Sequence, residues 1–186
     1  MIGAKKQTRI FSFHLMQIPR FTAFLLVPGA MAFLTGCAGP SYTYRYVPGK
    51  TATVENGYAV APPSAPPQVK AAIDAGNQIA GKPYSYGGGH RTCCEMDSAY
   101  DCSGSASYVL HAAGRLSDPM PSHGFRRYGR GGEGDWISIY ARHGHVFLVV
   151  AGLRFDTGWT HNPHGPQWTT KSRPADGCVI RHPAGL

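Results

Sequence analysis

Two residues of this sequence have the types and settings needed for nucleophilic catalysis. Cys102 stands in the run Asp101-Cys102-Ser103-Gly104, where a helix is predicted to begin. The backbone N–H groups and the dipole at a helix start favour a thiolate, the nucleophilic form of cysteine. Because the carboxylate of Asp101 opposes that charge, an imidazolium is also needed nearby. We therefore expect a cysteine that works with a histidine.

His145 is the histidine best placed for this role. It follows Gly144 and opens the apolar run Val146-Phe147-Leu148-Val149-Val150, which predicts a strand. A side chain at the start of a strand has a fixed position on the scaffold. His143, two residues earlier, is the alternative base.

The elements that must position these two residues can be read from apolar periodicity. Apolar residues at helical spacing predict a first helix from near Val69 to Ala80, with Gly81 as its stop. A second helix is predicted over residues 102–113, with Asp101 at its start and Gly114 past its end. Residues 136–140, 146–151 and 153–156 are rich in branched and aromatic residues and predict antiparallel strands. Helices followed by strands predict an α+β domain.

The N-terminal residues have the order of a secretory signal. Four basic residues and no acidic residue precede or border an apolar run over residues 21–34, which ends in Leu34-Thr35-Gly36-Cys37. Pro28 and Gly29 interrupt that run, so a retained transmembrane helix is the weaker interpretation. Leu-Thr-Gly-Cys resembles the bacterial lipobox, which implies a lipoprotein signal peptide over residues 1–36 and a lipid on Cys37. Translation begins at Met1 or at Met16.

The next segment differs in composition from both of its neighbours. Residues 37–68 are rich in Pro, Gly, Ser, Thr and Tyr and show no periodicity, so we expect a disordered tether after the lipidated cysteine. The catalytic domain is then expected over residues 69–186. No internal repeat is visible.

Charge and cysteine content constrain the partners and the compartment. The chain of 186 residues carries a net charge of +8, and without residues 1–36 it has 14 basic against 10 acidic side chains. This mild excess gives no argument for nucleic-acid binding. In an oxidising compartment we expect one disulfide to Cys178, with Cys93 or Cys94 as its partner.

Four short motifs together resemble the NlpC/p60 family of cysteine peptidases. They occur in the family's order and cover roughly residues 69–160: Tyr84-Ser85-Tyr86-Gly87-Gly88, Asp101-Cys102-Ser103-Gly104, Gly134-Asp135-Trp136-Ile137 and Gly144-His145-Val146. The resemblance implies a papain-like fold in which an antiparallel sheet packs against the helix that carries the cysteine. The long run from Gly89 to Tyr100 and Phe147 after His-Val depart from the family's pattern.

The resemblance also implies roles for particular residues. Cys102 would attack, His145 would be the base, Asp156 would orient His145, and Tyr84 would line the acyl site. The family more often has His, Asn or Gln at the third position, so His161 and His164 remain alternatives to Asp156. For substrate binding we expect Ser103, which follows the nucleophile, together with Arg126 and Arg127, whose guanidinium groups suit free carboxylates.

The implied function is hydrolysis of amide bonds in peptidoglycan stem peptides, between D-glutamate and the diamino acid, through a cysteine thioester. The resemblance implies no metal and no other cofactor. We expect a monomer anchored by the lipid on Cys37, at the periplasmic face of an outer membrane because Ala38 follows that cysteine. The alternatives are a non-hydrolytic wall lipoprotein, a related thiol amidase or acyltransferase, or a metal-binding protein. The metal ligands would come from His143, His145, His161, His164 and the Cys93-Cys94 pair.

Overall fold

The computed structural model describes residues 41–91, 95–158, 160 and 165–186. The chain divides into two units, residues 1–36 and 37–186, and all described residues belong to the second unit. The expected signal peptide and Cys37 lie outside the described residues. Among the described residues, we find no helix with the length and apolar character that crossing a membrane requires.

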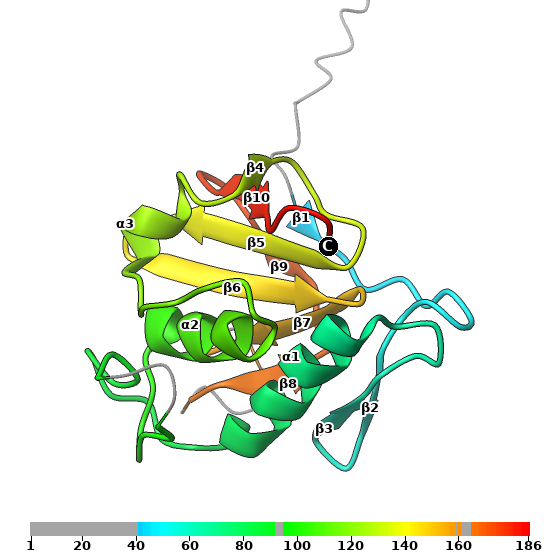
Figure 1. The fold of residues 1–186 in the computed structure, drawn as a ribbon, viewed down its shortest axis with the longest axis horizontal. Helices are drawn as coiled ribbons and strands as arrows, with labels where there is room; N and C mark the ends of the chain where they lie inside the picture. Colours follow the sequence, from blue (N-terminus) through cyan, green and yellow to red (C-terminus); the bar gives the residue numbers. More distant parts are fainter. Residues whose placement is uncertain (1–40, 92–94, 159, 161–164) are drawn as a thin grey trace, which may run out of the picture. The chain divides into compact units, whose positions relative to one another are not determined.

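A six-stranded antiparallel sheet forms the centre of this unit, with strand order β4-β10-β5-β6-β7-β8 (Figure 1). Its strands are β4 (Arg130–Gly131), β5 (Ile137–Arg142), β6 (His145–Val150), β7 (Leu153–Asp156), β8 (Gln167–Thr169) and β10 (Val179–His182). The three predicted strands are confirmed as β5, β6 and β7, which pair in sequence order.

Helices cover one face of the sheet. They are α1 (Pro67–Ile79), α2 (Cys102–Ala112) and the short α3 (Ser122–Phe125). Both predicted helices are therefore confirmed, and Gly81 and Gly114 follow them with positive φ angles of 80° and 66°. Gly76 in α1 permits close packing on β8, since a Cβ there would lie 2.4 Å from Cζ2 of Trp168. The predicted α+β class, with an antiparallel sheet packed on the helix that carries Cys102, is confirmed.

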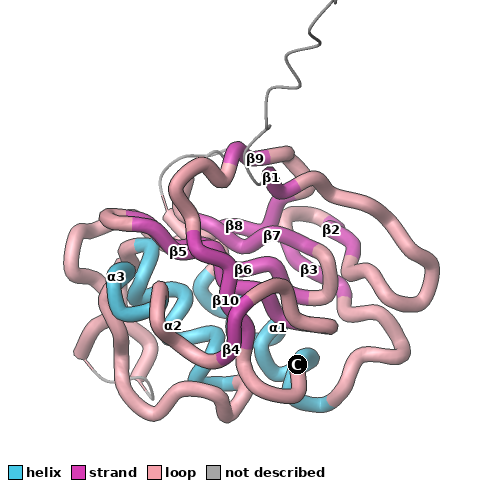
Figure 2. Tube along the Cα trace, turned by 90° about the horizontal axis from the view of Figure 1, so that it is seen from above, coloured by secondary structure: helices cyan, strands magenta, loops and turns pink. Residues whose placement is uncertain are grey.

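A second, smaller layer covers the other face. The strands β1 (Ser41–Tyr42) and β9 (Arg173–Pro174) pair antiparallel, and Figure 2 shows them on the opposite side of the sheet from α1 and α2. Beneath them lies a cluster of buried residues separate from the main core, formed by Tyr42, Tyr140, Phe147 and Ala175. Tyr140 and Phe147 stack with ring centroids 4.7 Å apart.

The expectation of a disordered tether is wrong for residues 41–66. In addition to β1, this segment forms a hairpin of β2 (Thr53–Glu55) and β3 (Tyr58–Val60), joined by Asn56 and Gly57 with φ angles of 52° and 87°. Two residues with positive φ are what a tight hairpin turn requires. Ala52, Ala59 and Ala65 are buried in the main core. The folded domain therefore includes residues from 41 onward and does not begin at residue 69.

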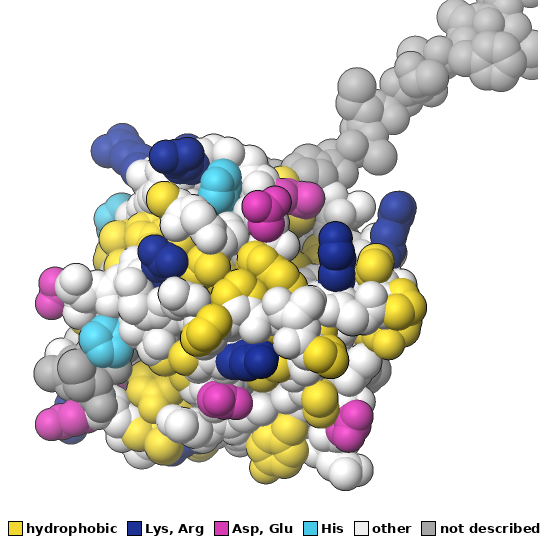
Figure 3. Space-filling view, turned by 45° about the vertical axis from the view of Figure 1, so that its right-hand side comes forward, with side chains coloured by type: hydrophobic (Ala, Val, Ile, Leu, Met, Phe, Trp, Pro, Cys, Tyr) yellow, Lys and Arg dark blue, Asp and Glu magenta, His cyan; other side chains and the backbone are white. Residues whose placement is uncertain are grey.

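Charged side chains are dispersed over the surface. On the face drawn in Figure 3, the Lys and Arg side chains of the described residues are scattered among polar and hydrophobic groups and do not form a single patch.

Candidate active site

The first turn of α2 presents Cys102 beside a well-satisfied helix start. Oδ1 of Asp101 accepts hydrogen bonds from the backbone N–H of Ser103 at 2.9 Å and of Gly104 at 2.7 Å, which caps the helix. Cys102 is buried, with 8% of its surface exposed. A Cβ on Gly104 would lie 2.0 Å from the carbonyl oxygen of Gly88, so only glycine lets these backbones approach. The Gly-Gly segment of the sequence motif thus lies against the start of α2.

Asp101 also ties the loop before α2 to the helix. Its Oδ2 accepts from the backbone N–H of Gly87 at 3.0 Å, and its Oδ1 lies 3.0 Å from Nε2 of His90. Burial alone would raise the pKa of Asp101, but the hydrogen bonds from Gly104, His90 and Gly87 outweigh it and lower the pKa below its ordinary value. His90 was not predicted as a site residue, because it follows a glycine run with no periodicity.

His145, at the first position of β6, contacts both predicted partners. Its Nε2 lies 2.9 Å from Oδ1 of Asp156, and its ring lies close enough to the side chain of Cys102 to interact with it. Because Nε2 faces Asp156, Nδ1 is the ring nitrogen that remains available to the sulfur. Burial lowers the pKa of His145, but the interactions with Asp156 and Cys102 more than offset this, so the pKa is raised. The structure therefore brings Cys102, His145 and Asp156 together in one line of contacts.

Asp156 has two further partners that sequence reasoning missed. Its Oδ2 accepts hydrogen bonds from Nη1 of Arg173, at 2.6 Å, and from Nη1 of Arg154. Asp156, Arg154 and Arg173 are 1%, 0% and 5% exposed. A signal was available: Arg154 shares the face of β7 with Asp156 because strand residues alternate, and a buried arginine requires an acidic partner.

A cleft of about 620 Å³ opens beside Cys102. Four segments line it, namely the loop before α2, the first turn of α2, the start of α3 and the turn between β5 and β6. The lining residues are Tyr84, Tyr86, Gly87, His90, Asp101, Cys102, Ser103, Pro121, Ser122, His123, His143 and Gly144. Tyr84 is 47% exposed. Partial burial and the electrostatic influence of Cys102 and Asp101 raise the pKa of Tyr84 above its ordinary value. Tyr84 and Ser103 both line the cleft beside Cys102, and their roles there stay predictions.

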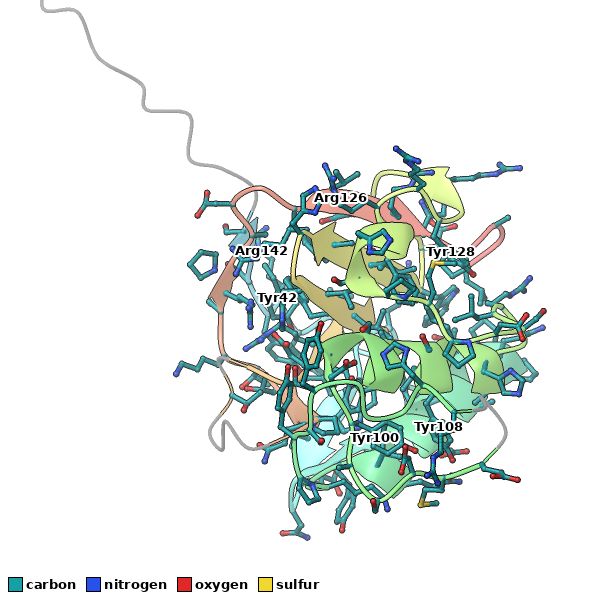
Figure 4. All side chains as sticks on the ribbon, turned by 90° about the vertical axis from the view of Figure 1, so that its left-hand side faces the viewer. Tyr42, Tyr100, Tyr108, Arg126, Tyr128 and Arg142 are labelled. Carbon is teal, nitrogen blue, oxygen red and sulfur yellow. The ribbon has the colours of Figure 1, made fainter. Side chains whose placement is uncertain are left out.

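The two predicted substrate-binding arginines are not among the residues that line this cleft. Arg126, labelled in Figure 4, donates from Nη1 to Nε2 of His143 at 2.9 Å, so it contacts a residue that does line the cleft. Arg127 is exposed next to it. His143 is held by Arg126, whereas Cys102 contacts His145, which favours His145 as the base.

The remaining candidates fall partly outside the described residues, since His161, His164, Cys93 and Cys94 are not described. Within the described ranges, no group of three His, Cys, Asp or Glu side chains is placed to hold a metal ion. Cys178 is half-buried and forms no disulfide with the other described cysteine, Cys102.

The fold and the site together define an α+β domain with a cysteine, histidine and aspartate in contact. No family model matches the sequence, and no curated protein matches it. Among solved structures, the chain is similar to Rv1477, described as a hypothetical invasion protein of Mycobacterium tuberculosis, with TM-score 0.42 and 21% identity over 62% of each chain. Two mutated forms of the resuscitation promoting factor interacting protein RipA match with TM-score 0.43 and 20% identity over 72% of each chain. The chain thus spans less than two thirds of the Rv1477 chain.

Proposed function

We propose that this protein is a cysteine-type hydrolase that cleaves amide bonds in peptidoglycan stem peptides. The observation that carries the proposal is the line of contacts from Cys102, at the start of α2, through His145 to the buried Asp156. A nucleophile in contact with a base that a third group orients is the general arrangement of covalent acyl transfer.

The chemistry follows from this arrangement. The thiolate of Cys102 attacks the amide carbonyl carbon, and the C–N bond breaks as the imidazolium of His145 protonates the leaving amine. Neutral His145 then takes a proton from water as the water oxygen attacks the thioester carbon; the C–S bond breaks, the acid leaves, and the Cys102 thiolate and His145 imidazolium are regenerated. Because Asp101 accepts the N–H groups of Ser103 and Gly104, we assign the oxyanion to the N–H of Cys102.

The choice of wall peptides as substrate rests on the cleft and on the NlpC/p60 motifs. Tyr86 at its rim is 93% exposed and offers an aromatic surface to an extended peptide. His143, supported by the guanidinium of Arg126, gives the cleft a donor for a peptide carboxylate. We propose that the bond cut is the one between D-glutamate and the diamino acid.

The proposed location depends on the N-terminal residues. Lipidation at Cys37, which follows the lipobox-like Leu34-Thr35-Gly36, would hold the domain in the cell envelope, at the periplasmic face of an outer membrane. Labelling of cells with a fatty-acid analogue tests this: the wild-type chain should be labelled and a Cys37→Ala chain should not.

Digestion of defined wall peptides tests the activity. The full chain should produce two fragments from a stem peptide, identified by mass, and Cys102→Ala should produce none. Cys178→Ala is the matched control, because Cys178 is not among the residues that line the cleft. Intact peptide with the folded wild-type chain across a range of pH would refute the proposal.

A further inference from the structure

Asp156 is held by two arginines from different strands. Arg154 lies on β7 and Arg173 on β9, and both donate to the same carboxylate oxygen, Oδ2. Both also donate to the carbonyl oxygen of Gly158, at 3.0 and 2.9 Å. Oδ1 is left to accept from His145 and from the N–H of Gly158. The carboxylate is thus fixed from several directions, and one oxygen faces the imidazole.

Both guanidinium groups lie over the ring of Phe147, with Cζ atoms 5.8 Å (Arg154) and 5.2 Å (Arg173) from its centroid. The Phe147 ring in turn lies 6.4 Å from that of His145. Cations over an aromatic face are attracted to it. The two arginines therefore pack on the ring of Phe147, which also neighbours the ring of His145.

The N-terminal strand closes the other side of this cluster. Tyr42 of β1 is 5% exposed, and its hydroxyl donates to the carbonyl of Gly152 at 3.0 Å and accepts from the N–H of Arg154 at 3.2 Å. Its ring centroid lies 5.9 Å from Cζ of Arg154, and it is the register partner of Arg173 in the β1–β9 pair. Figure 4 labels Tyr42 beside β9, on the far side of the sheet from α2.

We infer that Arg154, Arg173 and Tyr42 are positioning residues of the active site, which hold Asp156 so that His145 stays against Cys102. This inference rests on the Cys102–His145 pair of the proposed function. A buried charge without its partner is strongly unfavourable, so the two arginines and the acid require one another and require a cover. The strand β1 supplies that cover, which makes the segment expected to be a tether a part of the catalytic apparatus.

The test measures the reactivity of Cys102 without a peptide substrate. Iodoacetamide alkylates thiolates. After digestion, the fraction of the Cys102 peptide that carries the added mass gives the alkylation rate of Cys102 separately from that of the other cysteines. Full chains carrying Arg173→Gln, Arg173→Lys or Tyr42→Phe are compared with wild type across pH. Arg181→Gln is the control, because Arg181 donates instead to the carbonyl groups of Tyr128 and Gly129.

If the inference holds, Arg173→Gln loosens His145 from Cys102, and the alkylation profile moves to higher pH, with a rate at pH 7 reduced by about tenfold. Arg173→Lys, which keeps the charge and one donor, should regain most of that rate. Tyr42→Phe, which removes only a hydroxyl, should move the profile in the same direction by a smaller amount. Arg181→Gln should match wild type.

Two outcomes would overturn the inference. A merely structural role would lower the melting temperature of Arg173→Gln and leave the profile of the folded fraction unchanged. A profile moved to lower pH would mean that only the charge of Arg173 acts, since that charge lowers the pKa of His145. If Arg173→Gln does not fold, the alkylation profile of Tyr42→Phe distinguishes the same outcomes. Failure of the wild-type chain to cut wall peptides would leave this result standing and would refute only the proposed function.

Discussion

Removal of the Asp101 carboxylate should destabilise the protein measurably, and the contacts of Asp101 give the size of the effect. In Asp101→Ala the N–H groups of Ser103 and Gly104 lose their shared acceptor in a buried helix start. Loss of an N-cap side chain costs about 0.5–2 kcal/mol. Because Asp101 is only 6% exposed, water replaces it poorly, and we expect a loss near the upper end, about 2 kcal/mol. For a domain of this size that corresponds to a melting temperature lower by about 4–8 °C.

Urea and thermal denaturation followed by circular dichroism measure this loss. Asp74→Ala is the matched control, because Asp74 is an exposed acid inside α1 with no capping role. It should change the free energy of unfolding by less than about 0.5 kcal/mol. Asp101→Asn keeps a capping oxygen and should recover most of the loss. Equal effects of Asp101→Ala and Asp74→Ala would refute the assignment of Asp101 as the support of α2.

The same carboxylate makes a pH prediction. The pKa of Asp101 is below its ordinary value of 3.8, so its contribution to stability is complete above that pH. It is lost as the pH falls through the lower, folded-state pKa, because the unfolded chain then binds the proton more tightly. Wild type should therefore lose stability more steeply than Asp101→Asn below about pH 4. If the free energy of unfolding fell equally steeply with pH in both chains below about pH 4, the hydrogen-bond argument would be contradicted.

Three further predictions concern packing, the base and the N-terminal segment. Gly104→Ala should lower the free energy of unfolding by about 1–3 kcal/mol and abolish peptide cleavage, because the new Cβ meets the backbone of Gly88. Gly131→Ala is its control: a Cβ there meets only the flexible end of an arginine side chain, so this variant should match wild type in denaturation and activity assays. The pKa of His145 is raised in the folded protein, so its contribution to stability is complete below its ordinary pKa of 6.5 and is lost as the pH rises through the folded-state pKa. The urea midpoint of wild type should therefore fall over that pH range, and the midpoint of His145→Gln should not. A chain that starts at Val69 lacks three core alanines and the β2–β3 hairpin, so it should show a lower melting temperature and weaker near-ultraviolet circular dichroism than the full chain; an unchanged melting curve would refute the inclusion of this segment in the core.

The parts of the fold that sequence could predict are those with strong periodicity. The helix α2 was readable because Asp101 and Gly114 mark its ends, and β6 because five apolar residues follow His145. Physical rules that act within a few residues, such as capping and alternation, are enough for these elements. The contact between Cys102 and His145 then follows from packing α2 on the sheet.

The segment of residues 41–66 was missed for the opposite reason. Its buried hydrophobic side chains are three alanines and one tyrosine, which leave no hydrophobic pattern, and its prolines resemble those of a linker. The usable signal was Asn56-Gly57 between two short runs of branched and aromatic residues, a strong hairpin indicator. Strand β1 of this segment packs beside Arg173, which lies more than a hundred residues later in the sequence, and no local rule connects such distant positions.

The position of His145, the proposed base, is set by the alternation of side chains along β6. Val146, Leu148 and Val150 belong to the main core under the helices, so Phe147 and His145 must face the opposite side of the sheet. Cys102 approaches from the helix side, and the two meet because His145 is the first residue of the strand. A slip of one residue in the pairing of β5 with β6 would turn His145 toward the helices and bring valine and leucine against Asp156 and its arginines. The burial that stabilises this strand therefore also excludes the register in which His145 would lose its contact with Asp156, so the geometry of the proposed active site and the core depend on the same residues.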